Sequence, residues 1–232
     1  MNRPATERER ARRRESQSVR RDALVGGRRA DEELERLREE ARKCTACPLW
    51  KHATQTVFGE GPGSARVLLV GEQPGDQEDR QGRPFVGPAG QLLDRALEAA
   101  GIDRRSVFVT NVVKHFKWEL RGKRRLHKKP IQREIDACMQ WLEREIATLQ
   151  PRVIVCLGAT AAQSLLGPQF RVTTQRGQLV PSKLATYVFA TIHPSAILRL
   201  EGEEERGQAF HELVTDLQLM GTLLESSPPS PA

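Results

Sequence analysis

Residues 66–76 read Arg-Val-Leu-Leu-Val-Gly-Glu-Gln-Pro-Gly-Asp, an unbroken apolar run followed by a short polar turn. The same order recurs at residues 187–199, where Tyr-Val-Phe-Ala-Thr-Ile precedes His-Pro-Ser-Ala-Ile-Leu-Arg. Apolar runs without polar alternation are typical of parallel strands buried on both faces of a sheet. Functional groups in such sheets follow the carboxyl ends of the strands. Glu72 and His193 are therefore expected on one rim, as a carboxylate and an imidazole able to act as acid and base.

The rest of the core alternates between strand and helix patterns. Strands are expected at 66–71, 106–113, 152–157 and 186–192, and helices at 87–100, 131–149, 158–166 and 204–224. Gly101 follows the first of these helices as a C′ glycine, and Pro130 marks the start of the second. This alternation predicts a three-layer α/β/α sandwich around a parallel sheet.

The two ends of the chain differ in composition from this core. Residues 1–30 are rich in Arg and Glu with few apolar positions, so they are expected to be disordered. A helix is expected over residues 31–43, with Asp31 as its N-cap. Residues 226–232 are rich in Ser and Pro and are also expected to be disordered. One folded domain is therefore predicted over residues 31–225.

The net charge of +7 is concentrated in one internal segment. Residues 114–133 contain nine basic residues and one acidic residue, whereas the rest of the chain beyond residue 43 is net acidic. A basic segment on an acidic body fits contact with phosphates, so nucleic acid is the expected partner. The alternative is a solvated run of charges without a ligand.

Neither a membrane span nor a secretory signal is expected. The chain has no run of about 18 apolar residues. Its N-terminus is polar and Arg-rich, without the apolar region of a signal peptide. The expectation is a cytoplasmic, monomeric protein that does not bind membranes.

Four cysteines occur, and two of them form a CxxC turn. Cys44 and Cys47 are separated by Thr and Ala, Cys138 falls within an expected helix, and Cys156 lies near the end of an expected strand. Disulfides are rare in the cytosol, and four thiolates suit either zinc or an iron–sulfur cluster. The alternative is that Cys138 and Cys156 are ordinary buried cysteines. Spacing alone does not choose between the two metals.

Taken together, four motifs resemble the uracil-DNA glycosylase superfamily. They are Gly-Glu-Gln-Pro-Gly-Asp at 71–76, Gly-Arg-Pro-Phe-Val-Gly-Pro-Ala-Gly at 82–90, Asn111, and His-Pro-Ser at 193–195. The cysteine set is similar to that of the iron–sulfur, family-4 branch, and the resemblance covers about residues 44–220. It implies a four-stranded parallel sheet and a [4Fe–4S] cluster. The resemblance assigns as cluster ligands Cys44, Cys47, Cys138 and Cys156.

Two features depart from the ordinary family-4 pattern. Gln73 stands where that pattern has Ala, and the segment Lys-Arg-Arg-Leu-His-Lys at 123–128 has no counterpart in it. Both resemble the UdgX branch, whose loop reads Lys-Arg-Arg-Ile-His; Leu126 replaces the Ile here. Members of that branch become covalently attached to uracil-containing DNA through the loop histidine. The resemblance therefore implies His127 as the attacking residue.

The resemblance also implies a role for the motif residues in excision. Uracil must leave the base stack to reach a pocket, where Phe85 would stack on the ring and Asn111 would bond its edge. His193 would donate to uracil O2 as negative charge develops on the leaving base. Glu72 would stabilise the electron-deficient sugar, and neutral His127 would attack C1′ before water does.

The other motif residues would hold the DNA or the loop. Gln73 would place the loop or exclude water, and Arg199 would anchor the loop or the DNA backbone. Phosphate contacts are expected from the exposed basic side chains Arg124, Arg125, Lys128 and Lys129. Asp76 and Ser195, from the same motifs, are assigned to the uracil- and DNA-binding surface.

Each of several key residues also has a structural alternative. Glu72 could be a carboxylate near a helix N-terminus, where the helix dipole stabilises negative charge. Phe85 could be an aromatic residue of the core. Asn111 could pair with local backbone at a strand end. His193 could be structural, and Arg199 could form a surface ion pair.

The resemblance implies a uracil-DNA glycosylase, a DNA repair enzyme that becomes linked through His127 to the sugar left by uracil excision. Its substrate is uracil in single- or double-stranded DNA. One alternative is a family-4 enzyme with turnover, in which water attacks the sugar. Another is a non-catalytic DNA-binding protein with a four-cysteine metal site. The gathering of Glu72, Asn111 and His193 at strand ends favours an enzyme.

Overall fold

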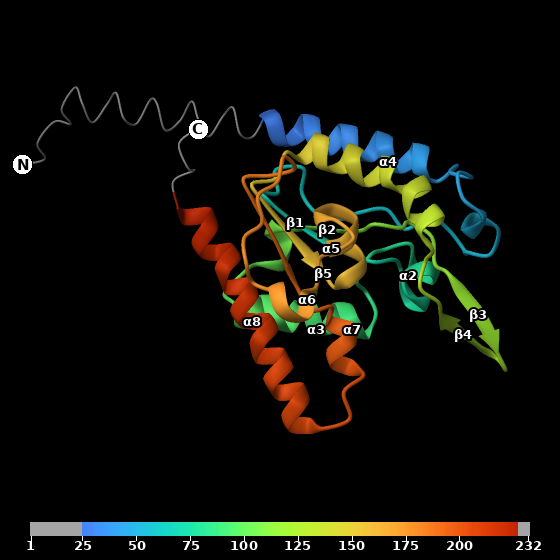
Figure 1. The fold of residues 1–232 in the computed structure, drawn as a ribbon. Coiled ribbons are helices and arrows are strands. Elements are labelled where there is room, and N and C mark those ends of the chain that lie inside the picture. Colours follow the sequence, from blue (N-terminus) through green and yellow to red (C-terminus); the bar gives the residue numbers. More distant parts are fainter. Residues whose placement is uncertain (1–24, 227–232) are drawn as a thin grey trace, which may run out of the picture.

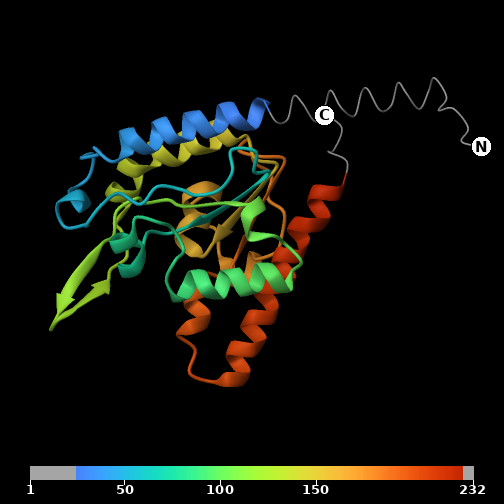
Figure 2. The same ribbon diagram turned by 180° about the vertical axis from the view of Figure 1, so that it is seen from behind.

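Four parallel strands form the centre of the structure, a computed structural model that describes residues 25–226 (Figure 1; Figure 2 is the view from behind). They are β1 Val67–Gly71, β2 Phe108–Asn111, β5 Val153–Leu157 and β6 Tyr187–Thr191, in the order β2-β1-β5-β6. Every residue of β1 and β5 is buried, as the continuous apolar runs indicated. The predicted three-layer α/β/α sandwich is confirmed.

Helices cover both faces of this sheet (Figures 1 and 2). On one face, Leu68 and Val70 pack in a core shared with the helix at residues 25–41, α4 Gln132–Leu149 and α5 Ala159–Leu166. On the other face, Val67 and Leu69 pack with α3 Pro88–Ala99, α7 Pro194–Leu198 and α8 Glu203–Glu225. Each strand therefore buries alternate side chains under a different helical layer.

The first helix extends further than the sequence predicted. Residues 25–41 are helical, so Asp31 lies inside the helix and is not its N-cap. The Asp31 carboxylate instead accepts a hydrogen bond from the Gly63 N–H at 2.5 Å. Gly27, which normally disfavours a helix, is accommodated by close packing, because a Cβ there would lie 3.1 Å from Ser64 Cβ. Residues 25–30, expected to be disordered together with the rest of 1–30, are helical. The remaining residues of the two segments expected to be disordered, 1–24 and 227–232, lie outside the described residues.

The basic segment forms a two-stranded antiparallel hairpin, here called the basic hairpin, that projects from the body (Figure 1). Its strands are β3 Trp118–Arg121 and β4 Arg124–His127, joined by a turn with Gly122 in the left-handed region at φ 61°. Only a loop was expected here. The strands escaped prediction because five of their eight residues are charged or histidine, which hides the strand pattern.

The remaining elements are short, and those not yet named are η1 Pro48–Lys51, α2 Asp76–Gln81, η2 Arg104–Ser106 and α6 Val172–Gln175. Among the residues that the structure describes, no helix is long and apolar enough to cross a membrane. Of these short elements, α2 matters most for the site, because it follows β1 directly and its acidic residues face the basic hairpin.

Candidate active site

The strand ends meet at one edge of the sheet. The register pairs Gly71 with Asn111 and Leu157 with Thr191, so neighbouring strands end at the same level. Glu72 follows β1 directly, and its carbonyl accepts a hydrogen bond from the Val113 N–H at 2.9 Å. These bonds hold the residues beyond β1 and β2 side by side, as the sheet topology led us to expect.

Glu72 contacts two side chains from other parts of the chain. Its Oε1 lies 3.2 Å from Nε2 of His127 at the end of the basic hairpin, and its Oε2 accepts a hydrogen bond from the Thr160 hydroxyl on α5. Burial disfavours the charged carboxylate, but the hydrogen bonds from His127 and Thr160 outweigh it and lower the pKa of Glu72. Glu72 is therefore ionised at neutral pH, beside an imidazole that is half exposed.

Thr160 was not predicted as a site residue. It is the third residue after β5, so the strand-end rule that singled out Glu72 and His193 would also have pointed to it. Its hydroxyl restricts the orientation of the Glu72 carboxylate.

An aromatic ring and an amide lie beside Gly71, and an imidazole lies beside the aromatic ring. A Cβ at this glycine would lie 2.4 Å from Asn111 Oδ1 and 2.7 Å from Phe85 Cζ. The rings of Phe85 and His193 stack with centroids 6.1 Å apart and planes inclined by 28°. Phe85 occupies the left-handed region at φ 56°, and Gly90 allows this turn because a Cβ there would lie 1.8 Å from the Phe85 carbonyl oxygen. Phe85 and Asn111 are both buried, at 7% and 2% exposure.

His193 is held as a neutral hydrogen-bond donor. Its Nδ1 accepts a hydrogen bond from the Ser195 N–H at 3.1 Å, which places the ring proton on Nε2. Burial lowers the pKa of His193 to about 4, although the nearby Glu72 carboxylate opposes this. The Nε2–H group is thus available to an acceptor at neutral pH.

Gln73 joins the two ends of the basic hairpin. Its amide nitrogen donates to the carbonyl oxygens of Lys117 at 3.2 Å and Lys128 at 3.0 Å, and its Oε1 accepts from the Lys117 N–H at 3.1 Å. The side chain is buried, so these bonds form away from water. Gln73 follows Glu72, and Lys128 follows His127. The bond between Gln73 and Lys128 therefore holds the backbone of His127 close to that of Glu72.

Arg125 anchors the hairpin to the body of the protein. Its Nε lies 2.5 Å from Asp76 Oδ1 and its Nη1 lies 2.7 Å from Asp79 Oδ2, while the guanidinium stands over the rings of Phe116 and Trp118. Arg125, which was expected to contact a phosphate, is only 13% exposed and pairs with carboxylates of the protein. Alternate strand residues face opposite sides, so Arg125 and His127 both turn toward the body.

The other predicted DNA-binding residues lie at the surface. Asp76 is partly exposed and pairs with Arg80 and Arg125, so it belongs to the hairpin anchor. Lys128 lies 3.0 Å from Glu119 across the hairpin, and Arg199 donates to the Ser195 hydroxyl at 3.3 Å. The exposed basic side chains next to His127 are Lys123, Arg124, Lys128 and Lys129.

A buried ion pair supports the backbone of Asn111. Lys114 Nζ lies 2.6 Å from Glu145 Oε2, and both side chains are fully buried. The ammonium group also donates to the Asn111 carbonyl at 2.8 Å and the Thr110 hydroxyl at 2.5 Å. Sequence reasoning missed this pair, because a lysine in a basic segment is normally exposed.

Comparison with known proteins identifies the family. The model of the uracil DNA glycosylase superfamily matches residues 58–218. The chain belongs to the uracil-DNA glycosylase superfamily. A type-4 uracil-DNA glycosylase of Thermotoga maritima is 40% identical over 177 residues, covering 76% of this chain and 88% of that protein. One from Pyrobaculum aerophilum is 37% identical over 188 residues, covering 77% and 92%. A type-5 uracil-DNA glycosylase of the same organism is 28% identical over 177 residues, covering 67% and 74%.

Membership in the superfamily confirms the family predicted from the motifs. The matched region contains the residues at the strand-end edge, namely Glu72, Phe85, Asn111, His127 and His193. Cys44 and Cys47 precede it. These five side chains are a carboxylate, two imidazoles, an amide and an aromatic ring.

Two of the cysteines expected to bind a metal accept hydrogen bonds from other parts of the chain. Cys44 Sγ accepts a hydrogen bond from Trp141 Nε1, and Cys138 Sγ accepts one from the Lys114 N–H, both at 3.2 Å. Within residues 25–226, no three His, Cys, Asp or Glu side chains converge as closely as a single metal ion needs.

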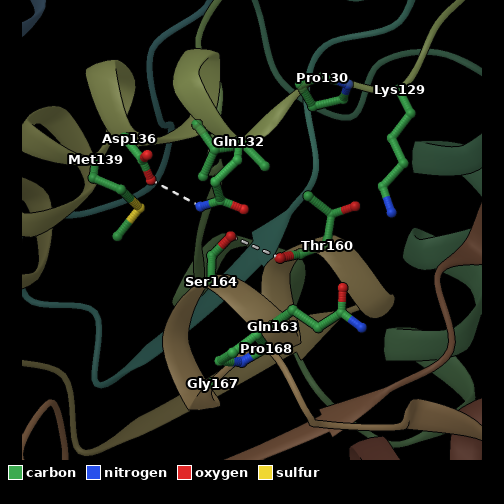
Figure 3. Close-up of a pocket in the computed structure, with 11 residues that line it drawn as sticks. Lys129, Pro130, Gln132, Asp136, Met139, Thr160, Gln163, Ser164, Gly167 and Pro168 are labelled. Atoms are coloured by element: carbon green, nitrogen blue, oxygen red, sulfur yellow. Dashed lines mark hydrogen bonds between the residues drawn. The ribbon is translucent and has the colours of Figure 1, made fainter.

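A cavity of about 660 Å³ adjoins the Glu72 side of the site. It lies between the start of α4 and α5, and Thr160, which bonds Glu72, is one of its lining residues (Figure 3). Gln132 and Ser164 contribute polar groups, bonded to Asp136 and to the Thr160 carbonyl at 2.8 Å each (Figure 3). Lys129, two residues after His127, lines the same cavity.

Proposed function

We propose that this chain is a uracil-DNA glycosylase that becomes covalently bound to the sugar from which it has removed uracil. The observation that carries the proposal is the contact between His127 Nε2 and Glu72 Oε1 at 3.2 Å. It brings a nucleophile and a base together at the sheet edge, where the superfamily motifs gather. The names of the type-4 relatives support the glycosylase activity.

Excision uses the group around Gly71. The flipped uracil stacks on Phe85, and the Asn111 amide bonds its edge. As the bond between C1′ and uracil N1 breaks, its electron pair stays on the base, and His193 Nε2–H donates to O2 where the negative charge develops. Neutral His193 suits this role, since the uracil anion later takes its proton from solvent.

Capture uses the basic hairpin. Loss of uracil leaves C1′ electron-deficient, and the negative Glu72 carboxylate stabilises it. A nitrogen lone pair of His127 forms a bond to C1′, and the proton of the resulting imidazolium passes to Glu72. Because the hairpin holds the imidazole in place, this attack is intramolecular and outruns water. The product is an N-glycosidic bond with no easy leaving group, so each molecule acts once.

The DNA backbone runs along the exposed basic side chains. Lys123, Arg124 and Lys128 would contact phosphates from the hairpin, and Arg199 would do so from the end of α7. The cavity beside Thr160 would receive a nucleotide next to the flipped one, with Lys129 near its phosphate. Either single- or double-stranded DNA can supply such a flipped nucleotide.

The [4Fe–4S] cluster is proposed as a structural group. Cys44, Cys47 and Cys138 would hold it beside the helix at residues 25–41 and α4. Such a cluster would tie the segment before β1 to α4. It supplies no step of the reaction, because none of these cysteines contacts Glu72, His127 or His193.

A turnover glycosylase is the second candidate, and the identity of up to 40% with type-4 enzymes favours it. In that case water attacks C1′ and His127 is a bystander. Incubation of the full chain with a labelled oligonucleotide containing one deoxyuridine separates the two on a denaturing gel. A slow band of mass protein plus oligonucleotide minus uracil supports capture. Free, alkali-labile product exceeding the enzyme supports turnover, and an oligonucleotide with thymine in place of uracil is the control.

A further inference from the structure

His115 is a buried side chain for which the excision mechanism has no use. It is 4% exposed, and its Nδ1 has no hydrogen-bond partner among the described residues. Its other nitrogen, Nε2, lies 2.9 Å from the Thr56 hydroxyl. A buried polar atom without a partner is rare and needs an explanation.

The hydrogen bonds of Thr56 fix the tautomer of this imidazole. The Thr56 hydroxyl has one proton, which it donates to the Ala41 carbonyl at 2.9 Å. It can therefore only accept from His115, so the ring proton lies on Nε2. Nδ1 then carries a lone pair, and no hydrogen-bond donor of the described residues reaches it. A ligating histidine has this arrangement, with one nitrogen free for the metal and the other donating to the protein.

The same bonds connect His115 to the cysteines. Ala41, which accepts from Thr56, also accepts from the Cys44 N–H at 3.0 Å. On the other side, the N–H of Lys114, the neighbour of His115, donates to Cys138 Sγ at 3.2 Å. Three hydrogen bonds, through Thr56 and Ala41, thus connect the imidazole to the Cys44 N–H, and the residue before His115 bonds Cys138.

Cys156 lies in a different setting. It is in the middle of β5, paired with Val70 of β1 and Ala190 of β6, and fully buried in the apolar core. Burial alone raises the pKa of its thiol to about 12. Cys138 lies instead on α4, where its Sγ accepts a hydrogen bond from the Lys114 N–H at 3.2 Å. Cys156 therefore fits the reading of an ordinary core cysteine.

We propose that His115, and not Cys156, is the fourth protein ligand of the iron–sulfur cluster, alongside Cys44, Cys47 and Cys138. This proposal rests on the proposed presence of the cluster, and it replaces the four-cysteine set expected from the sequence. A neutral imidazole in place of a thiolate makes the cluster less negative, and histidine ligation raises the reduction potential of iron–sulfur centres. The reduction potential of this cluster should therefore lie above that of a four-cysteine counterpart.

The test uses the full chain purified without oxygen, in wild-type form and as His115→Cys, His115→Ala and Cys156→Ala. Iron and sulfide content, the reduction potential and pulsed EPR of the paramagnetic cluster are measured. Wild type should contain about four irons per chain and show the nitrogen coupling of a ligated imidazole. His115→Cys should keep the iron, lose the nitrogen coupling and shift to a lower potential. His115→Ala should lose iron, and Cys156→Ala should match wild type.

Two results would overturn the assignment. One is iron-loaded wild type without nitrogen coupling; the other is loss of iron in Cys156→Ala with normal iron in His115→Ala. His115→Cys separates loss of a ligand from a folding defect, because it provides a thiolate where His115→Ala provides no ligand. Wild type that contains zinc and no iron would instead refute the proposed iron–sulfur cluster. The gel assay tests uracil excision separately, so its result does not depend on the ligand assignment or on the cluster.

Discussion

Replacing Arg125 by alanine should loosen the basic hairpin without weakening the contact with DNA. Arg125 bonds Asp76 and Asp79 and lies over two aromatic rings, whereas its neighbour Arg124 is exposed. The two arginines are adjacent in one strand and carry the same charge. Arg124→Ala is therefore a matched control for the Arg125→Ala change.

The size of the effect follows from the contacts that are lost. Asp79 is fully buried and would keep only the Thr54 N–H at 2.9 Å and the Thr54 hydroxyl at 2.5 Å. Removing a charged hydrogen-bond partner from such a group costs about 1.5–3 kcal/mol. The two lost contacts with aromatic rings add about 0.5–1 kcal/mol each, and the partly exposed Asp76 pair adds little. A total of about 3 kcal/mol corresponds to roughly a 100-fold increase in hairpin opening.

Hydrogen exchange of residues 118–127, followed by mass spectrometry, measures this opening. In Arg125→Ala the hairpin amides should exchange about 100-fold faster, while the amides of the central sheet keep their rates. The variant should form its DNA adduct more slowly, because His127 is no longer held in place. In Arg124→Ala exchange should be unchanged. The slope of log affinity against log salt should instead fall by about 0.9 for duplex or 0.7 for single-stranded DNA.

The opposite pattern would refute this reasoning. If Arg125→Ala left hairpin exchange unchanged and reduced the salt slope as much as Arg124→Ala, Arg125 would be a phosphate contact. The ion pairs with Asp76 and Asp79 would then have no anchoring role.

Three further changes test other parts of the site. Asn111→Asp should slow uracil excision at least about 10-fold in single turnover, because a carboxylate facing an acceptor loses about 1–3 kcal/mol; an unchanged rate would remove Asn111 from the pocket. The pKa of His193 is about 4 in the folded chain and 6.5 ordinarily, so the unfolded chain binds this proton first as pH falls. The stability that comes from keeping this ring neutral is fully present above pH 6.5 and is lost as the pH falls toward 4. Between these two pH values, the urea midpoint of unfolding should therefore drop less in His193→Asn than in wild type. Equal drops in the two proteins would contradict this. Lys114→Met should lower the free energy of unfolding by about 3–5 kcal/mol by leaving Glu145 buried and unpaired, whereas Lys117→Met, in a partly exposed pair, should cost far less. Similar urea curves for these two variants would argue against a special role of the buried pair.

The sheet and its helices were predictable because their side chains are dominated by burial. The strand expected at 152–157 is Val153–Leu157 in the structure, and the helix expected at 131–149 is Gln132–Leu149. Apolar runs and flanking Pro or Gly residues are local signals, and both survive in a single sequence. The strand-end rule then placed Glu72 and His193 on one rim without any knowledge of packing.

The features that sequence reasoning missed depend on tertiary partners. Arg125 and Arg124 look alike in the sequence, and only the register of β3 with β4 turns one of them toward α2. Lys114 is one lysine among many in a basic segment, yet Glu145, 31 residues away, allows it to be buried. His115 attracted no attention, because an unpartnered nitrogen is visible only when its surroundings are known.

The central claim is that His127 captures the sugar, and His127→Gly tests it most directly. The variant and the wild-type chain are incubated with a labelled oligonucleotide containing one deoxyuridine, and heated samples are run on a denaturing gel. Exposed His211 on α8 provides the control change His211→Gly. Wild type and His211→Gly should give the shifted protein–DNA band. His127→Gly should give none and should release alkali-labile product, because water enters the space left by the imidazole. A full-strength shifted band in His127→Gly would contradict the account and place the nucleophile elsewhere.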